Sequence, residues 1–294
     1  MLIADSFIKE GAMRTKITIL DENTVPGKMG GVYGEHGFSA FIEANGSRIL
    51  FDVGPTGMPT INNALRFGIN LKAITAIVLS HGHVDHTGGL PAILRITGRV
   101  KVYAHPDVFL DRYSIQDKRR IYVGMPYKRE ALEGMGANLD LSQEFREIAP
   151  AVYLTGEIPR KRPFEIGDPD LFIKKDGEFV PDSLLDDQAI ILDTEDGLVV
   201  LLGCSHAGTI NTLDLVQEKL GERPIHAILG GTHLDFAPLH QLEETIRILK
   251  GLGIEKLGLS HCTGLKSGAR LLTEFKDSAF FAPVGSTLEV GKAG

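Results

Sequence analysis

Short runs of β-branched and aliphatic residues alternate with segments of helical periodicity along most of the chain. Continuous apolar runs of about four to eight residues are typical of buried strands, whereas apolar positions three and four apart predict helices that pack by one face. Strands are predicted at 16–20, 38–43, 48–53, 76–80, 100–104, 151–155, 188–193, 197–203, 225–229 and 256–260, and helices at 61–67, 90–96, 209–220 and 239–250. This alternation is typical of α/β proteins, in which helices cover the faces of sheets.

The two halves of the chain repeat the same succession of elements. A shift of 150 positions lays residues 48–54 on 198–204 and residues 78–85 on 228–235, so that His83 falls on His233. With six more positions of shift, the strand that ends at His105 matches the one that ends at His261. Because polar residues occupy matching strand ends, the repeat predicts two packed sheets flanked by helices, related by a pseudo-two-fold axis, with one site at their common edge.

The segment from about 106 to 150 interrupts this order. It is rich in charged and aromatic residues and contains Gly124, Pro126, Gly134 and Gly136 as breakers of regular structure. We expect one domain over residues 1–294, with this segment as a partly helical insertion that acts as a lid or side wall. Its side chains suit a ligand with a phosphate and a flat ring, although a solvated surface or lid packing explains each one as well: Arg119, Arg120, Lys128, Arg129, Tyr113, Tyr122 and Tyr127.

The charge balance narrows the class of partner. The 294 residues include 31 Lys and Arg against 38 Asp and Glu, a net charge of -7, and 43% of them are apolar. An acidic chain without a basic tail argues against non-specific nucleic-acid binding, and no apolar run approaches the roughly 18 residues of a membrane span. Two cysteines cannot form the disulfide framework of small secreted proteins. We therefore expect a cytoplasmic protein whose partner is neither nucleic acid nor membrane.

Four potential metal ligands fall within six residues, directly after the predicted strand at 76–80. His81 and His83 lie in the turn and can reach one ion, whereas Asp85 and His86 lie where the next helix would open and can face a second ion. Neutral imidazoles with a carboxylate suit zinc, iron or manganese. The alternative is a polar loop of hydrogen-bonded histidines, which would not require so many donors in so short a stretch. The motif therefore predicts a metal centre.

The sequence H-x-H-x-D-H followed by T-G-G resembles the signature of the metallo-β-lactamase superfamily. The resemblance covers nearly the whole chain and implies an αββα sandwich, which the repeat also predicts. Residues 50–54 resemble the first family motif, whose aspartate, here Asp52, orients a metal-bound histidine. Residues 259–264 resemble the closing motif, whose histidine, here His261, completes the second metal site. A solvated turn at Asp52 and an ordinary strand-end histidine at His261 are the alternatives.

The third and fourth family motifs depart from the usual pattern. Many members carry a histidine in T-P-G-H-T and a bridging aspartate in T-G-D, where this chain has T-G-E at 155–157 and G-C-S-H at 203–206. The resemblance implies His206 as the replacement ligand, with Glu157 and Cys204 as further candidates, and it leaves the bridging ligand open. We predict two divalent cations, zinc before iron or manganese, held by His81, His83 and His206 on one side and by Asp85, His86 and His261 on the other.

The combination of motifs is similar to one branch of the superfamily, the 7,8-dihydropterin-6-yl-methyl-4-(β-D-ribofuranosyl)aminobenzene 5′-phosphate synthases. The resemblance implies a metal-dependent enzyme that acts on a phosphorylated small molecule and joins a pterin methyl diphosphate to a ribosylated aminobenzene phosphate. The alternative is a metal-dependent hydrolase, either a phosphodiesterase or, less favoured by the missing motifs, a lactamase or thioester hydrolase. A di-iron redox protein would need a flavin or iron–sulfur module, and a metal-stabilised binding module would not need four donors.

Several polar residues are candidates for catalysis and substrate binding. Asp85 is predicted to be catalytic as well as a ligand, and His233, at the pseudo-symmetric place of the metal motif, is predicted to be a substrate-facing acid or hydrogen-bond donor. Arg160 follows Glu157 on a loop predicted at the edge of the site, where it would bind phosphate unless it lies on the solvated surface. Glu157, Arg160 and Cys204 are the predicted substrate contacts, and the oligomeric state is left open.

Overall fold

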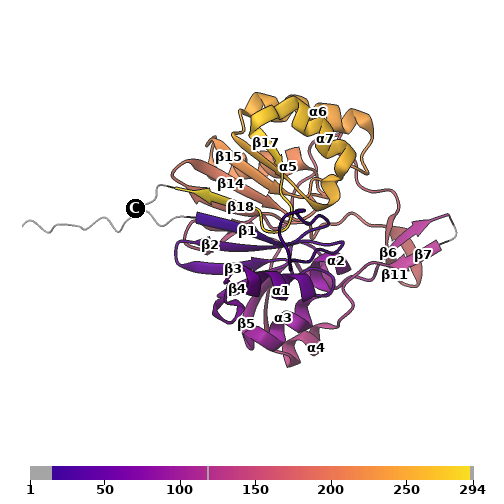
Figure 1. Cartoon of the computed structure of the whole chain (residues 1–294). Helices are drawn as coiled ribbons and strands as arrows, with labels where there is room; N and C mark the ends of the chain where they lie inside the picture. Colours follow the sequence, from indigo (N-terminus) through magenta and orange to yellow (C-terminus); the bar gives the residue numbers. More distant parts are fainter. Residues whose placement is uncertain (1–14, 118, 292–294) are drawn as a thin grey trace, which may run out of the picture.

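The computed structural model describes residues 15–117 and 119–291, and its two main sheets pack face to face with helices on both outer faces (Figure 1). Apolar side chains of both sheets form the central core, among them Ile17 and Ile42 from the first sheet and Leu192 and Val199 from the second. Two further apolar cores lie between each sheet and its helices. The predicted αββα sandwich is confirmed.

The first sheet has the strand order β18-β1-β2-β3-β4-β5-β8. Its strands are β1 (Thr15–Asp21), β2 (Ser39–Ala44), β3 (Ser47–Phe51), β4 (Ala76–Val78), β5 (Val100–Ala104), β8 (Ala137–Leu141) and β18 (Thr287–Val290). Strands β3, β4, β5 and β8 run parallel, and the other neighbours pair antiparallel. In β2, Ala40 and Ile42 enter the central core while Phe41 packs under the helices, because successive side chains point to opposite faces. Burial of both faces explains the continuous apolar runs of the sequence.

The second sheet has the order β17-β16-β15-β14-β13-β10-β9. Its strands are β9 (Arg146–Ala149), β10 (Val152–Leu154), β13 (Ile190–Thr194), β14 (Gly197–Leu202), β15 (Ile225–Gly230), β16 (Lys256–Leu259) and β17 (Ala279–Phe281). Strands β14 to β17 pair in parallel and the rest antiparallel, so each pairing has a counterpart of the same direction in the first sheet. The terminal strands are exchanged, since β9 ends the first repeat but joins the second sheet, and β18 ends the second repeat but joins the first.

Helices cover the outer faces as the sequence predicts (Figure 1). The α-helices are α1 (Met58–Arg66), α2 (Val84–Thr87), α3 (Leu90–Thr97), α4 (Arg129–Gly134), α5 (Thr209–Leu220), α6 (Leu239–Leu252) and α7 (Leu265–Phe275). Short 3-10 turns lie at Leu71–Ala73, Pro106–Phe109, His261–Thr263 and Lys276–Ser278. Within residues 15–117 and 119–291, none of the helices combines the length and the apolar character that a membrane span requires.

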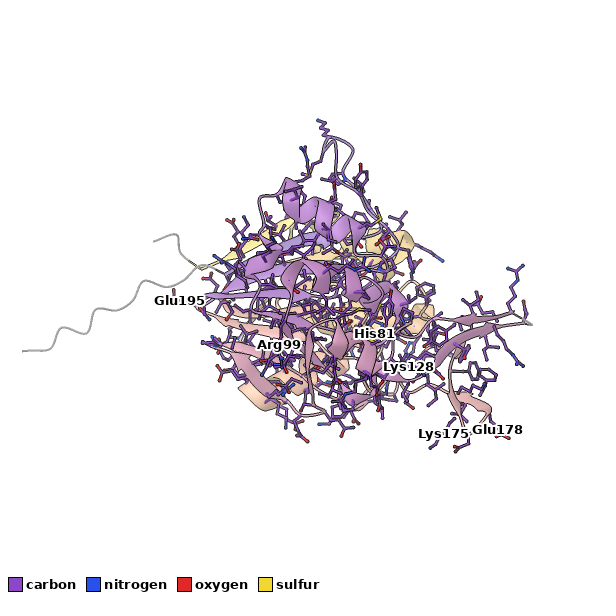
Figure 2. All side chains as sticks on the ribbon, turned by 90° about the horizontal axis from the view of Figure 1, so that it is seen from below. His81, Arg99, Lys128, Lys175, Glu178 and Glu195 are labelled. Atoms are coloured by element: carbon purple, nitrogen blue, oxygen red, sulfur yellow. The ribbon has the colours of Figure 1, made fainter. Side chains whose placement is uncertain are left out.

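The segment at 106–150 is partly helical, as predicted, through α4 and the turn at Pro106–Phe109, but most of its regular structure is strand. Besides α4, the segment contains β6 (Arg112–Gln116), β7 (Arg119–Tyr122), β8 and β9, and the last two belong to the main sheets. Strands β6 and β7 join β11 (Leu171–Lys175) and β12 (Glu178–Pro181) in a small sheet of order β12-β11-β6-β7. Figure 2 shows Lys175 and Glu178 at the outer end of this small sheet, which projects from the body that contains His81. Strand β7 is exposed on both faces, so its charged side chains carry no apolar pattern to reveal it.

Candidate metal centre

Polar residues follow the parallel strands of both sheets at one common edge. Asp52 follows β3 and His81 follows β4 in the first sheet, and Cys204, His233 and His261 follow β14, β15 and β16 in the second. Carboxyl ends of parallel strands meet at the same edge of a sheet, which is where α/β proteins place their sites. The repeat of the sequence therefore brings its matching polar residues together.

Four non-glycine residues at or directly after these strand ends have a left-handed backbone conformation. Asp52, Ser205, His233 and His261 have φ angles of 56°, 60°, 54° and 50°. This left-handed region is unfavourable for residues with a Cβ atom, and such residues persist there only where the surrounding contacts fix them. Strained positions of this kind cluster at functional sites.

His81, His83 and His206 form the first cluster of potential ligands. His81 Nε2 lies 2.9 Å from His83 Nδ1, and one ring nitrogen of each of the three lies within 4.8 Å of the others. Burial lowers the pKa of His81 and of His206 well below the usual value, and that of His83 to about 3. All three are therefore neutral imidazoles near pH 7, the form that binds metal ions.

Asp85, His86 and His261 form the second cluster. His86 Nε2 lies 3.2 Å from His261 Nε2, and Asp85 Oδ2 lies 3.8 Å from the former atom and 3.4 Å from the latter. Burial opposes ionisation of Asp85, but the neighbouring His86 and His261 lower the pKa of its carboxyl group well below the usual range. The second cluster therefore offers one carboxylate and two imidazoles.

Unpaired ring nitrogens indicate that the first cluster is built for a ligand from outside the chain. His83 Nε2 and both ring nitrogens of His206 are buried and have no hydrogen-bond partner among the described residues. Buried polar atoms are nearly always paired, because an unpaired one loses its hydration without compensation. A cation would pair with one of the two His206 nitrogens, and imidazole with carboxylate is a donor set that zinc, iron and manganese accept. The residues present therefore fit a metal centre.

Asp52 orients His86, a residue of the second cluster, through the ring nitrogen that faces away from the cluster. Its Oδ2 atom lies 2.7 Å from His86 Nδ1 and accepts a hydrogen bond from Ser80 Oγ at 2.7 Å. Its Oδ1 atom accepts another from the Ser80 backbone N–H at 2.7 Å, and the side chain is fully buried. A carboxylate on Nδ1 fixes the imidazole ring and leaves Nε2 facing the cluster.

We expect Asp52→Asn to weaken metal binding by about 10- to 100-fold, because losing a hydrogen-bonding partner of a ligand histidine has effects of this size. A competition titration against a coloured chelator measures the affinity. Asp214 lies on α5, and Asp214→Asn removes a charge from its half-buried ion pair with Arg162; this control should leave the affinity unchanged. Equal affinities of wild type and Asp52→Asn would reduce Asp52 to a turn residue.

The residues that support His261 and the first histidine loop escaped the sequence analysis. The His261 backbone N–H donates to Glu22 Oε1 at 2.7 Å, and His261 Nδ1 lies 2.9 Å from Asn23 Oδ1. Their only signal in the sequence is that polar residues 21–23 directly follow the first predicted strand. Polar residues that follow a strand at the edge of the site are therefore candidate site residues even without a motif.

A buried ion pair holds the loop between His81 and His83. The Gly82 backbone N–H donates to Asp186 Oδ2 at 2.7 Å, and Arg112 Nη2 donates to Asp186 Oδ1 at 2.8 Å. Burial raises the pKa of Asp186 to about 7, although Arg112 opposes the shift. A Cβ atom on Gly82 would lie 2.3 Å from the carbonyl oxygen of Val108, so glycine is required there. Arg112 belongs to β6, which links the small sheet to the metal loop.

A pocket of about 380 Å³ opens onto both clusters. Ser114 and Gln116 of β6 line one side, so the small sheet contributes to the wall. A second pocket of about 300 Å³ shares lining residues with the first, namely Asp168, Pro169, His206, His233 and Phe236. The two pockets together offer room for a ligand with a polar end at the clusters and a second group beyond them.

His233 lies between the first cluster and a carboxylate. Its ring centroid is 4.2 Å from that of His206, and its Nε2 atom lies 3.4 Å from Asp168 Oδ2. The ring of Phe236 lies 4.8 Å from the ring of His233, and Phe236 is 64% exposed. Asp168 and Phe236 lie in loops without a motif, so no sequence pattern indicated either residue.

Two of the predicted substrate contacts line neither pocket. Arg160 donates through Nη1 to the carbonyl oxygen of His206 at 2.7 Å and through Nη2 to that of Ser183. Glu157 Oε2 lies 3.9 Å from His105 Nε2. Neither Arg160 nor Glu157 is among the residues that line the two pockets, whereas Cys204 lines the larger one. Arg160 therefore positions the His206 loop, a role that sequence order alone does not reveal because it gives no side-chain direction.

The two-sheet sandwich and its histidine and carboxylate clusters define a metal-binding protein of the αββα type. The sequence profile of the metallo-beta-lactamase superfamily matches residues 32–261. The chain belongs to the metallo-beta-lactamase superfamily, and the donor set at its strand ends is that of a metal-dependent enzyme.

The chain is also similar to individual relatives and solved structures. It is 34% identical, over 83% of its length and 86% of the relative, to 7,8-dihydropterin-6-methyl-4-(beta-D-ribofuranosyl)-aminobenzene-5'-phosphate synthase of Methanocaldococcus jannaschii. A solved metal-dependent hydrolase of the beta-lactamase superfamily superposes with a TM-score of 0.81 and 27% identity, covering 95% of this chain and all of the other. A diphosphatase of the PhnP family shares the fold, with a TM-score of 0.53, 17% identity and coverages of 95% and 98%.

Proposed function

We propose that this protein is a two-metal enzyme that acts on a phosphorylated small molecule, and that its reaction is the transfer of a dihydropterin methyl group from a diphosphate. The observation that carries the proposal is the pair of buried ligand clusters at the mouth of a pocket large enough for a flat ring. The 34% identity with a dihydropterin-linked synthase over most of both chains supports the substrate class. Zinc is the metal we favour, because imidazoles dominate the donor set.

The pocket lining supports a substrate with a planar ring. Phe236 is an exposed aromatic side chain beside His233, and both rings line the two connected pockets. Offset or tilted stacking on such a ring contributes about 0.5–1.5 kcal/mol beyond the burial of area. The ring would therefore lie toward Phe236, while the phosphate end faces the clusters.

Within the proposed mechanism, the chain binds and orients while the ions provide charge. Two divalent cations held by the two clusters would neutralise phosphate oxygens and act as Lewis acids. His233 Nε2 is held beside Asp168 Oδ2, which fixes the ring orientation and keeps a proton on that nitrogen. Ser114 and Gln116 offer further hydrogen bonds from the opposite wall. A leaving diphosphate would thus lie near the cations and within reach of hydrogen-bond donors of the pocket lining.

A metal-dependent hydrolase is the second candidate. The observation that favours it is the superposition with a solved metal-dependent hydrolase at a TM-score of 0.81 and 27% identity. Both reactions break a bond to a phosphorylated group, and they differ in whether water or a second substrate is the acceptor. A weak phosphodiesterase activity is compatible with either.

Metal analysis followed by a turnover assay tests the proposal. We expect about two ions per chain and consumption of a dihydropterin methyl diphosphate only when the ribosylated aminobenzene phosphate is present. Consumption without the acceptor would favour the hydrolase. A metal-loaded protein that cleaves the lactam nitrocefin while leaving pterin diphosphates and phosphodiesters untouched would contradict the phosphate-centred function.

Replacement of Phe236 by alanine tests whether the planar ring of the substrate lies against Phe236. The loss of about 0.5–1.5 kcal/mol of stacking should raise KM by about 2- to 12-fold with little change in kcat. Leu239→Ala is the matched control, because Leu239 is 70% exposed but lines neither pocket. An unchanged KM in Phe236→Ala, or an equal rise in both variants, would place the ring elsewhere.

A further inference from the structure

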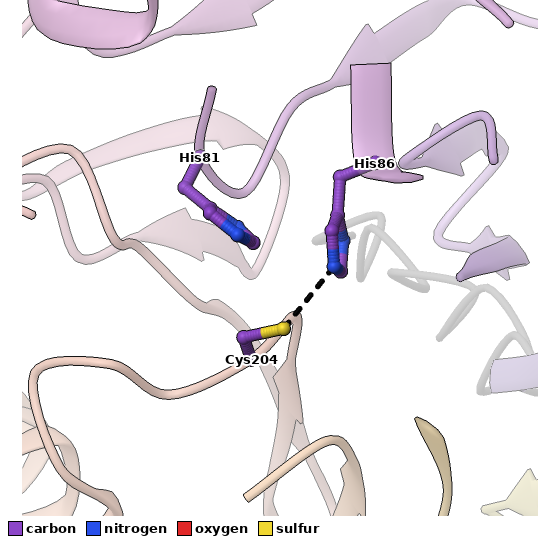
Figure 3. A group of neighbouring side chains, drawn as sticks. All are labelled: His81, His86 and Cys204. Carbon is purple, nitrogen blue, oxygen red and sulfur yellow. Dashed lines mark hydrogen bonds between the residues drawn. The ribbon is translucent and has the colours of Figure 1, made fainter. Parts of the chain in front are cut away.

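The sulfur atom of Cys204 lies between the two ligand clusters. Cys204 follows β14 and is 3% exposed, and its Sγ atom lies 3.2 Å from His86 Nε2. It also lies within 4.8 Å of a ring nitrogen of His81, which belongs to the first cluster. Figure 3 shows the rings of His81 and His86 on one side and the thiol on the other, with the Sγ atom directed toward His86.

The surroundings of this sulfur contain further donors. The Sγ atom lies within 4.8 Å of a ring nitrogen of His206, of His233 and of His261. Both ring nitrogens of His206 are buried and have no hydrogen-bond partner among the described residues, so they are free to bind a metal ion beside Cys204. Two ligands on one tetrahedral zinc are about 3.5 Å apart, given bonds of about 2.0–2.3 Å to nitrogen and sulfur. The 3.2 Å separation of Cys204 Sγ and His86 Nε2 is close to this value.

The second buried thiol has a different environment. Cys262 Sγ accepts the backbone N–H of His233 at 3.3 Å and lies 3.5 Å from the carbonyl oxygen of Cys204, to which it can donate. Among the described residues, its one group of potential ligands contains Cys204 and His261, and no group joins it to a residue of the first cluster. Cys262 is therefore tied to the backbone, whereas Cys204 faces ligands of both clusters.

We propose that the Cys204 thiolate bridges the two metal ions and is a ligand of both. The inference rests on the two-metal centre of the proposed function. On binding, the thiol loses one proton to solvent and its sulfur forms one bond to each ion, with no change of oxidation state. A shared thiolate selects zinc or iron over magnesium, because sulfur is a soft donor.

X-ray absorption at the zinc edge of the zinc-loaded full chain tests the bridge. A bridging thiolate gives one sulfur neighbour per zinc at about 2.3 Å in a protein with two zinc ions. A thiolate bound to one ion alone gives half a sulfur per zinc. Cys204→Ser should have no sulfur neighbour, and Cys262→Ser, the matched control, should keep one per zinc.

Every other result contradicts the bridge. Half a sulfur per zinc in the wild type would make Cys204 a ligand of one ion, and retention of sulfur in Cys204→Ser would assign it to Cys262. A chain that binds one zinc alone would exclude the bridge outright. Cys204→Asp, which we expect to retain two zinc ions without sulfur, covers the case in which Cys204→Ser does not fold.

The same samples separate this inference from the proposed function. Turnover of dihydropterin methyl diphosphate is measured on each protein after its zinc and sulfur content is known. One sulfur per zinc with no turnover would reject the proposed reaction and keep the bridge. Turnover with half a sulfur per zinc or none would keep the reaction and reject the bridge.

Discussion

An Asp85→Ala variant should lose the metal of the second cluster and, with it, nearly all turnover. Asp85 supplies the only carboxylate of that cluster and lies 3.4 Å from His261 Nε2. Its loss removes a ligand and also a negative charge that offsets the cations. We expect the affinity for the second ion to fall by more than about 100-fold, beyond the 10- to 100-fold typical of a lost hydrogen-bonding partner. Equilibrium dialysis with metal analysis measures the number of ions retained per chain.

Asp170→Ala is the control for this variant. Asp170 lines the same pocket, but its carboxylate accepts from Gln116 Nε2 at 2.9 Å and belongs to neither cluster. It should retain two ions per chain. Two retained ions in Asp85→Ala as well would remove Asp85 from the set of ligands and leave it as a pocket residue only.

The second large effect concerns stability rather than chemistry. Arg112→Met should lower the free energy of unfolding by about 3–5 kcal/mol, because breaking a buried ion pair leaves an uncompensated charge. Arg112 and Asp186 have side chains that are 1% and 0% exposed, and Arg112 also donates to Asp182 Oδ2 at 2.7 Å. Burial raises the pKa of Asp186 to about 7 even beside Arg112. Without Arg112 this pKa should rise further, and protonation of Asp186 would then remove the uncompensated buried charge. The loss should therefore be smaller at pH 5 than at pH 8.

Denaturant titration of the metal-free proteins at both pH values measures this effect. Arg129→Met is the control, because Arg129 pairs with Glu133 across one helical turn and both side chains are about half exposed. Exposed pairs of this kind contribute about 0.3–0.5 kcal/mol. A similar small loss in Arg112→Met would show that the ion pair does not anchor the metal loop.

Periodicity and the repeat predicted the sandwich because its strands are buried on both faces. The strands at 76–80, 100–104 and 225–229 form mostly apolar runs, with Lys101 and His226 as single interior polar residues, and none of them is an edge strand. Four of the missed strands are of the opposite kind. Strands β7 and β12 are largely exposed, and β17 and β18 are short edge strands. Their pairing depends on neighbours distant in sequence, which local apolar patterns do not report.

The candidate site divides along a similar line. The motif residues and His206 were predicted because they are metal-binding side chains at strand ends, and the structure brings them into two clusters. The contact of Arg160 with the His206 carbonyl was not predicted, because an arginine in a loop has no periodicity that fixes its direction. Asp168 lies in the loop between β10 and β11, and the tertiary fold brings this loop close to His233.

The exchange of β9 and β18 between the two repeats has a consequence for folding. Each repeat supplies the edge strand of the other repeat's sheet, so either half on its own would expose the unpaired backbone of β1 or of β10. Loss of structure in one half therefore uncovers an aggregation-prone edge in the other. The chain should unfold in one cooperative step, and an isolated half should self-associate through the strand that its missing partner normally covers.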